Sequence, residues 1–286
     1  AYLTDSPDIG TVNGRRAVCK YQRAETLYRS VLEIFDASAG AIGVRGGAGG
    51  TRGVVLFTAA SGGTGCSSCA AACAVRFARA GRRTLYLNLE PLGGAGAFFT
   101  GEGQSDFSDV IFALKSGAAN LQLKLEIGAR RDDSGVFFFA EPRTAFDMRE
   151  LDGGDMDALM TQLETSGMYE YIVVDAAFAP GPTVSCMLRR ATALVFVSDG
   201  SEMANMKLER ARRALEIMES QDDAARTPPV YVFYDKFSGK TGERAQYDGA
   251  RVLGGAPRYE GADTARIVSI LSELDAFDAL ADADAI

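Results

Sequence analysis

The sequence has no histidine among its 286 residues, and it has no long apolar run. Without histidine, a serine–histidine–aspartate triad, a histidine metal site and a histidine proton shuttle are all excluded. The apolar runs fall short of the about 20 residues that a membrane-spanning helix needs, and no secretory signal pattern opens the chain. Cysteine occurs five times, mostly within apolar segments, which indicates a reducing compartment rather than a disulfide framework.

Basic residues are also fewer than acidic residues. Lys and Arg number 30 against 38 Asp and Glu, which gives a net charge of −8. Nucleic acid requires a basic footprint, so we expect no nucleic-acid binding. The stretch 202–221 carries basic residues interleaved with glutamates, which is more typical of a solvated helix face than of a DNA-binding patch. These basic residues are Lys207, Arg210, Arg212 and Arg213.

Buried β patterns alternate with helical patterns from residue 53 onward. Near-continuous apolar strands separated by helices predict an α/β fold, a doubly wound and mostly parallel sheet with helices on both faces. Ligands of such sheets bind beyond the carboxyl ends of the strands. The predicted strands are 53–59, 83–89, 135–140, 171–176, 193–199 and 230–235. The predicted helices are 66–80, 105–116, 155–167, 183–191, 202–221 and 264–274.

A glycine-rich segment follows the first of these strands. The run GVVLFT leads into AASGGTGCSS, residues 59–68, and then into helical sequence. A phosphate-binding loop requires this order, because its glycines permit a tight turn whose N–H groups face an anion beside a helix N-terminus. A plain connecting turn is the alternative. The expected nucleotide-binding residues of the loop are Ser61, Gly62, Gly63, Thr64, Gly65, Cys66, Ser67 and Ser68, with the Ser67 hydroxyl as a Mg²⁺ ligand.

Three cysteines share one face of the helix that follows the loop, because Cys66, Cys69 and Cys73 are spaced i, i+3 and i+7. The C-x-x-C spacing permits a redox or metal centre. Small apolar residues throughout this helix favour packing under a sheet instead.

The loop resembles the deviant phosphate loop of the MinD/ParA family, K-G-G-x-G-K-[ST], in its glycines and hydroxyl. Both lysines are replaced, by Ser61 and Cys66. This departure, together with CAAACAVRFARAGRRTLYLNLE, SDFSDVIFALKSG, YDKFSGK and GGAPRYE, resembles the TadZ/CpaE-type pilus assembly proteins over about residues 53–280. The resemblance implies an atypical, P-loop NTPase-like ATPase domain over 53–286, with ATP and Mg²⁺ as its ligands.

The same resemblance identifies residues 1–36 as the C-terminal remnant of an atypical receiver domain. The strand-like RRAVCKY precedes a helical pattern over 24–35, and Lys20 matches the receiver lysine. We expect further sequence upstream of Ala1. Residues 37–52 are rich in glycine and are predicted to form a linker.

Two acidic residues gain roles from the resemblance. Asp175 ends the apolar strand YIVVDA and matches the Walker B-type acid, which holds Mg²⁺ through a water. A carboxylate there is otherwise costly, which favours the functional role. Where the family has D-x-D, this chain has Asn88, a leucine and Glu90. Glu90 is the candidate catalytic residue that positions a water, and a plain loop residue is the alternative.

The base-binding side departs further from the family. An asparagine after a late strand reads the base there, and this chain has Asp235 in VYVFYDKF. Aspartate cannot also donate to a ring nitrogen, so we expect weaker base selectivity. Lys236 is expected to stack or pair nearby. Pro257 and Arg258 match the family's loop against base and ribose, with plain loop geometry as the alternative.

The missing lysines predict weak catalysis. Phosphoryl transfer relies on positioning and charge stabilisation, and losing one such stabiliser costs about 10²–10³ in rate. Backbone N–H groups and Mg²⁺ remain, so we expect nucleotide binding with weak or no hydrolysis. A basic residue from elsewhere, such as Arg258 or Lys240, is a candidate substitute for the lost ammonium groups.

The resemblance implies a homodimer with ATP at its interface. This dimer would localise or organise a tight-adherence (Flp) type IV pilus secretion machine, with other pilus and secretion assembly proteins as partners. The expected location is the cytoplasm, at a cell pole or an assembly site. A slow ATPase switch of the MinD/ParA type and a nucleotide-free structural dimer are the alternatives. The acidic tail lacks the basic amphipathic helix of MinD relatives, so we expect no direct membrane insertion.

Overall fold

The computed structural model describes residues 2–6, 10–22, 27, 50–103, 105–117, 121–221 and 227–281. The chain divides into two compact units, Ala1–Ala48 and Gly49–Ile286. The division falls within the predicted linker 37–52. Most of the predicted helix 24–35 and of that linker lies outside the described residues, so the predicted boundaries at 36 and 52 stay predictions.

The first unit contains a three-stranded sheet in the order β1-β3-β2. Its strands are β1 (Tyr2–Thr4), β2 (Thr11–Val12) and β3 (Arg15–Cys19). β1 lies parallel to β3, and β2 lies antiparallel to it. The end of β3 is buried, and Lys20 directly after it pairs with Asp5 at 2.6 Å. β3 lies within the predicted strand RRAVCKY, whereas the origin of this unit in a receiver domain stays a prediction.

An eight-stranded sheet forms the centre of the second unit, in the order β11-β10-β9-β4-β8-β5-β7-β6. Every neighbouring pair is parallel except β6 and β7, which are antiparallel. The strands are β4 (Gly53–Thr58), β5 (Thr84–Asn88), β6 (Ala129–Arg131), β7 (Phe137–Phe139), β8 (Tyr171–Asp175), β9 (Ala193–Ser198), β10 (Val230–Tyr234) and β11 (Ala250–Gly255).

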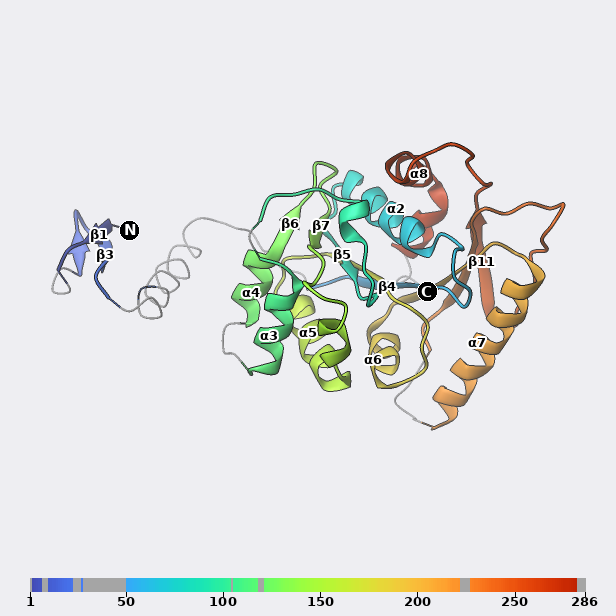
Figure 1. The fold of residues 1–286 in the computed structure, drawn as a ribbon, viewed down its shortest axis with the longest axis horizontal. Coiled ribbons are helices and arrows are strands. Elements are labelled where there is room, and N and C mark those ends of the chain that lie inside the picture. Colours follow the sequence, from blue (N-terminus) through green and yellow to red (C-terminus); the bar gives the residue numbers. More distant parts are fainter. Residues whose placement is uncertain are drawn as a thin grey trace. The chain divides into compact units, whose positions relative to one another are not determined.

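Helices cover both faces of this sheet (Figure 1). α2 and α8 lie above it in the view, and α3, α4, α5 and α6 lie below it. The predicted doubly wound α/β fold is therefore confirmed. The helices are α2 (Cys66–Arg79), α3 (Phe107–Lys115), α4 (Leu121–Gly128), α5 (Gly153–Thr165), α6 (Pro182–Arg190), α7 (Glu202–Gln221) and α8 (Thr264–Leu271), with short 3-10 helices at Ala95–Ala97, Asp147–Glu150 and Asp275–Leu280.

The central strands are buried along their whole length because layers of helices pack on both sides. Every residue of β4, β8 and β9 is buried. Side chains along a strand point alternately into two cores. Leu56 lies in the core between the sheet and helices α5 and α6, and Phe57 lies in the core between the sheet and α2. The alanines of α2 from 70 to 74 are fully buried, and their small size lets this helix lie close to the sheet.

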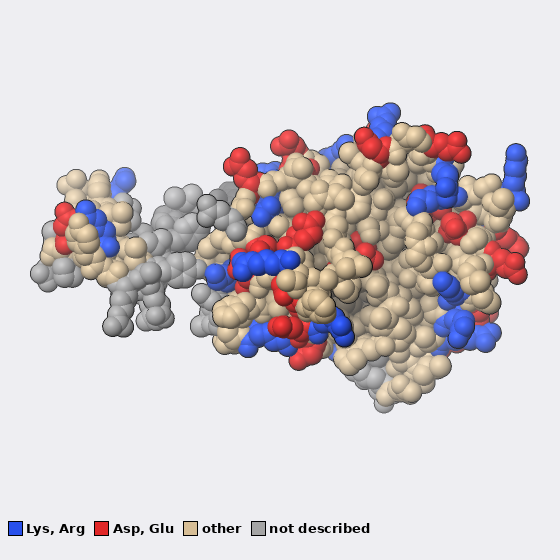
Figure 2. All heavy atoms as spheres, in the orientation of Figure 1, with Lys and Arg blue, Asp and Glu red and all other residues tan. Residues whose placement is uncertain are grey.

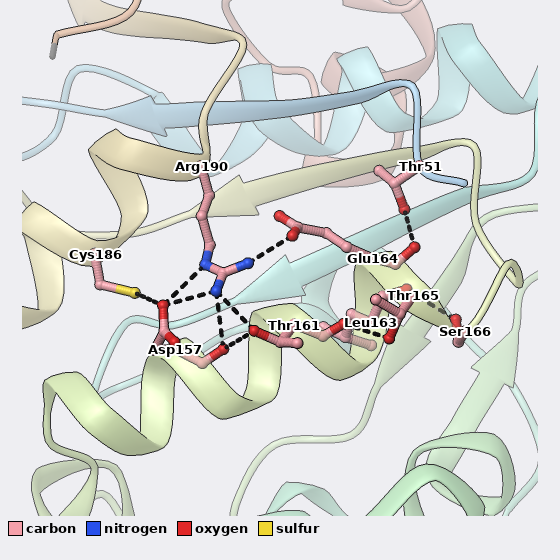
Figure 3. Close-up of polar contacts among 9 residues, drawn as sticks. All are labelled: Thr51, Asp157, Thr161, Leu163, Glu164, Thr165, Ser166, Cys186 and Arg190. Atoms are coloured by element: carbon pink, nitrogen blue, oxygen red, sulfur yellow. Dashed lines mark hydrogen bonds and ion pairs between the residues drawn. The ribbon is translucent and has the colours of Figure 1, made fainter. Parts of the chain in front are cut away.

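One arginine ties α5 to α6 beneath the sheet (Figure 3). Arg190 of α6 donates to the Asp157 carboxylate at 2.7 Å and to the Glu164 carboxylate at 2.6 Å. The Glu164 carbonyl accepts from the Thr51 hydroxyl at 3.4 Å, just before β4 begins. This network fixes two helices and the entry to the central strand in one arrangement.

Charges of both signs are intermingled on the surface shown in Figure 2. On α7, Arg212 and Arg213 pair with Glu209, and Arg212 also pairs with Glu216. These pairs support the solvated helix face rather than the DNA-binding patch. Among the helices within the described part of the chain, none is long and apolar enough to cross a membrane.

Candidate nucleotide-binding site

The polar strand ends predicted from the sequence meet at the carboxyl edge of the sheet. Asp175, the last residue of β8, lies opposite Phe57 of β4 and Asn88 of β5. From β4 the chain crosses to β5 on one side, and from β8 it crosses back to β9 on the other. Such a reversal of strand order opens a crevice at the carboxyl edge, where doubly wound sheets bind their ligands.

The glycine loop between β4 and α2 has the backbone geometry of an anion cradle. Gly63 has φ 78° and Gly65 has φ 88°, both in the left-handed region that favours glycine. Gly65 is the N-cap of α2, which has neither a side-chain cap nor an acidic residue in its first turn. The first N–H groups and the positive end of the helix dipole are thus left to an anion.

A hollow of about 450 Å³ opens over this loop. Its volume is within the range of small-molecule sites. Cβ atoms added to Gly62 or Gly63 would enter open space, so the loop backbone is accessible from the hollow. The lining consists of residues 59 and 61–68 together with Glu90, Ala177, Phe178 and Lys236. The structure therefore brings together all eight loop residues predicted, the candidate catalytic Glu90, and Lys236.

A larger hollow of about 680 Å³ lies at the opposite edge of the sheet, beside the first residues of β10 and β11, Val230 and Ala250. Doubly wound sheets place their ligands at the carboxyl edge. Of these two hollows, the smaller one over the glycine loop is therefore the candidate site.

Asp175 is the centre of a buried polar cluster beneath the loop. The Tyr86 hydroxyl donates to its carboxylate at 2.8 Å, and the Asn88 amide donates at 3.1 Å. The Cys66 thiol lies 3.8 Å from its second oxygen. Burial, and next the charge of Glu90, raise the pKa of Asp175 to about 6, while hydrogen bonds from Tyr86, Ser67 and Cys66 oppose the rise.

Tyr86 and the bridging role of Asn88 were not predicted from the sequence. The Asn88 amide also donates to the Tyr86 hydroxyl at 3.2 Å, and its oxygen accepts from the Glu90 N–H at 3.0 Å. Residues 86 and 88 alternate along β5, so both face the same side. With Thr84, they make three polar residues on one side of a strand whose other side is Leu85 and Leu87, and this alternation is the signal that could have identified them.

Replacing Tyr86 with phenylalanine tests this cluster. The variant loses a donor that favours the ionised carboxylate, so the pKa of Asp175 rises further. We expect the pH at which Mg²⁺-dependent ATP binding is half lost to rise by about one unit. Calorimetric titrations from about pH 5.5 to pH 8.5 would measure it.

The matched control is Tyr169→Phe, because the buried Tyr169 hydroxyl has no hydrogen-bond partner among the residues that the structure describes. This control should keep the wild-type pH profile. A Tyr86→Phe profile that coincides with the wild type would contradict the role given to the cluster.

The burial of the α2 cysteines bears on whether they pack in the core or act as reactive thiols. Cys69 and Cys73 are fully buried, and burial raises the pKa of the Cys66, Cys69 and Cys73 thiols. Thiolates are therefore scarce. Across the described residues, no group of three His, Cys, Asp or Glu side chains is placed to hold a metal ion by itself. These observations favour packing over a redox or metal centre.

The predicted base-binding residues lie apart from the hollow, except for Lys236. Asp235 is buried against the loop, so that a Cβ on Gly65 would overlap its carboxylate oxygen. Burial raises the pKa of Asp235 to about 6, and the charges of Lys236 and Arg258 oppose that rise. Pro257 and Arg258 follow β11 but do not line the hollow. Base contacts from these three residues stay predictions.

Comparison with known proteins supports the fold at low sequence identity. No family model matches the chain, and no curated protein matches it. A ParA family ATPase from Chlorobium tepidum is 18% identical, with a TM-score of 0.59 over 81% of this chain and 97% of that one. The MinD complex with MinC from Aquifex aeolicus is 18% identical, with a TM-score of 0.54 over 81% and 93%. A variant of McdA from Cyanothece, solved in complex with ATP, is 14% identical, with a TM-score of 0.59 over 83% and 98%.

Proposed function

We propose that this chain binds ATP with Mg²⁺ at the glycine loop and hydrolyses it weakly or not at all. The observation that carries the proposal is the loop itself, whose two left-handed glycines precede an uncapped helix and open onto a hollow of about 450 Å³. Backbone N–H groups and the Ser67 and Ser68 hydroxyls would hold the phosphates. The likeness to an ATP-bound McdA supports the choice of nucleotide.

The residues around Asp175 suit Mg²⁺ as well. Magnesium prefers oxygen ligands and is bound through one or two carboxylates together with substrate phosphates. Asp175 interacts with the Ser67 side chain and is ionised above about pH 6. We assign the metal to the Ser67 hydroxyl and, through a water, to Asp175. When bound, the ion would neutralise charge on the phosphates.

Weak hydrolysis follows from the two replaced lysines. Cys66 stands where the MinD/ParA loop has its second lysine, and its thiol faces Asp175. Ser61 replaces the first lysine at the edge of the same hollow. Glu90 is present to position a water, but a single carboxylate adds no positive charge to the transition state.

We further propose a homodimer with nucleotide at the interface, acting as a scaffold for a tight-adherence pilus machine. Gly62 and Gly63 are exposed, so a second copy can approach the loop. The resemblance of the sequence motifs to TadZ/CpaE-type proteins supports the pilus role, with other pilus assembly proteins as partners. The same motifs support a location at a cell pole or assembly site.

Solution mass and phosphate release, measured together, test this function. We expect the mass to double when Mg-ATP is added, with negligible phosphate release over hours. A doubled mass that decays as phosphate appears would instead identify a slow ATPase switch. A mass that does not respond to Mg-ATP would favour the nucleotide-free structural dimer or a monomer, and would overturn the proposal.

A further inference from the structure

Lys236 reaches the glycine loop from the other side of the site. Its Nζ donates to the Gly63 carbonyl at 2.8 Å, although the two residues are 173 positions apart. Its side chain also passes Gly65, since a Cβ built there would lie 3.5 Å from Lys236 Cε. Among the described residues that line the hollow, Lys236 is the only cation.

The backbone on both sides of Lys236 is held in place. Phe237 N–H donates to the Ala256 carbonyl at 3.0 Å, and Ala256 N–H donates to the Tyr234 carbonyl at 2.9 Å. Lys236 itself has φ 57°, a left-handed conformation that a lysine adopts at some cost. This turn directs the side chain from the end of β10 toward the loop, and the surrounding hydrogen bonds maintain it.

The Lys236 ammonium group can still donate hydrogen bonds to a ligand in this position. An ammonium has three donors. Among the described residues, the Gly63 carbonyl is the one acceptor to which the Lys236 ammonium donates. Its charge also counteracts the rise that burial causes in the pKa of Asp235. An ammonium with two further donors, beside a loop that has no cation of its own, is suited to bind a phosphate oxygen.

We propose that Lys236 supplies the phosphate-binding ammonium group that Ser61 and Cys66 do not, by exchanging the Gly63 carbonyl for a β- or γ-phosphate oxygen of the bound nucleotide. This inference rests on the proposed function. The structure does not bring Arg258 or Lys240 to the hollow, so neither of these sequence-based candidates is chosen. Lys236, predicted to contact the base, is assigned to the phosphates instead.

The test is a set of calorimetric titrations with Mg-ATP, Mg-ADP and AMP. Lys236→Asn removes the charge and keeps a residue that tolerates a left-handed backbone. We expect its Kd for Mg-ATP to rise about 10- to 100-fold, the range expected for one charge-assisted hydrogen bond. The Kd for AMP should change less than about 3-fold. Lys240→Asn, an exposed lysine outside the hollow, is the matched control and should bind as the wild type does.

Lys236→Gly is a second variant in case Lys236→Asn misfolds, because glycine adopts the left-handed backbone without strain and also removes the ammonium. This variant should be at least as stable as the wild type and still lose affinity for ATP. Wild-type affinity for Lys236→Asn would overturn the inference and leave the proposed function standing. An equal loss for ATP and AMP would overturn it in favour of a base contact. A wild-type chain without ATP binding would overturn the proposed function itself.

Discussion

Gly65→Ala is expected to raise the Kd for Mg-ATP at least about 100-fold and to destabilise the second unit by about 2–4 kcal/mol. Two effects add. Gly65 has φ 88°, which penalises any residue with a Cβ, and that Cβ would overlap the carboxylate oxygen of buried Asp235. The loop and Asp235 must then separate, which displaces the N–H groups at the start of α2. Chemical denaturation and calorimetry would measure both changes.

Gly81→Ala separates the two effects. Gly81 has φ 79° near the other end of α2, and a Cβ there would meet no atom within 4 Å. This control should lose about 1–2 kcal/mol and keep wild-type binding. Combining Gly65→Ala with Asp235→Ala removes the overlap and should recover part of the lost stability. A Gly65→Ala chain that binds as tightly as the wild type would contradict the cradle geometry.

Asp175→Asn is expected to have opposite effects on stability and on binding. In the folded chain, burial raises the pKa of Asp175 from 3.8 to about 6. Between these values the unfolded state has already lost its proton, so the wild type loses stability as pH rises from about 4 to about 6. Asparagine removes this loss. The variant should match the wild type below about pH 4 and exceed it by up to about 3 kcal/mol above about pH 6.

Binding should move the other way. An amide cannot hold Mg²⁺ as a carboxylate does, so the affinity for ATP should no longer differ between Mg²⁺ and EDTA. Asp235→Asn is the matched control, because Asp235 is also buried with a pKa of about 6. It should reproduce the pH-dependent gain in stability and retain the effect of Mg²⁺. If Asp175→Asn keeps the Mg²⁺ effect, the metal assignment is wrong.

Most of the second unit could be predicted because its strands are apolar along their whole length. β4, β8 and β9 lie within the predicted strands 53–59, 171–176 and 193–199. Two of the elements that were not predicted show where the apolar pattern of the sequence fails to indicate secondary structure. The segment LQLKLEIG alternates apolar and polar residues as a strand does, yet it forms α4. β11 is an edge strand that ends in two glycines and is only partly buried, so its pattern is weak.

The glycine loop could be predicted because strand, glycines and helix are contiguous in the sequence. The cluster around Asp175 could be predicted only in part: the polar side of β5 shows in the sequence, but the register that places Asn88 beside Asp175 does not. The place of Lys236 depends on a left-handed turn at the end of β10 that the sequence VYVFYDKF does not signal. Contacts between distant segments, rather than residue types, decide which side of a nucleotide a lysine can reach.

Calorimetric titration of the wild-type chain with Mg-ATP tests the central claim most directly. The glycine loop, its helix N-terminus and Lys236 should together hold a triphosphate without either lysine of the MinD/ParA loop. We predict saturable heat that fits one site per chain, with a Kd below about 1 mM. No heat at millimolar Mg-ATP, from a chain shown to be folded, would contradict the account.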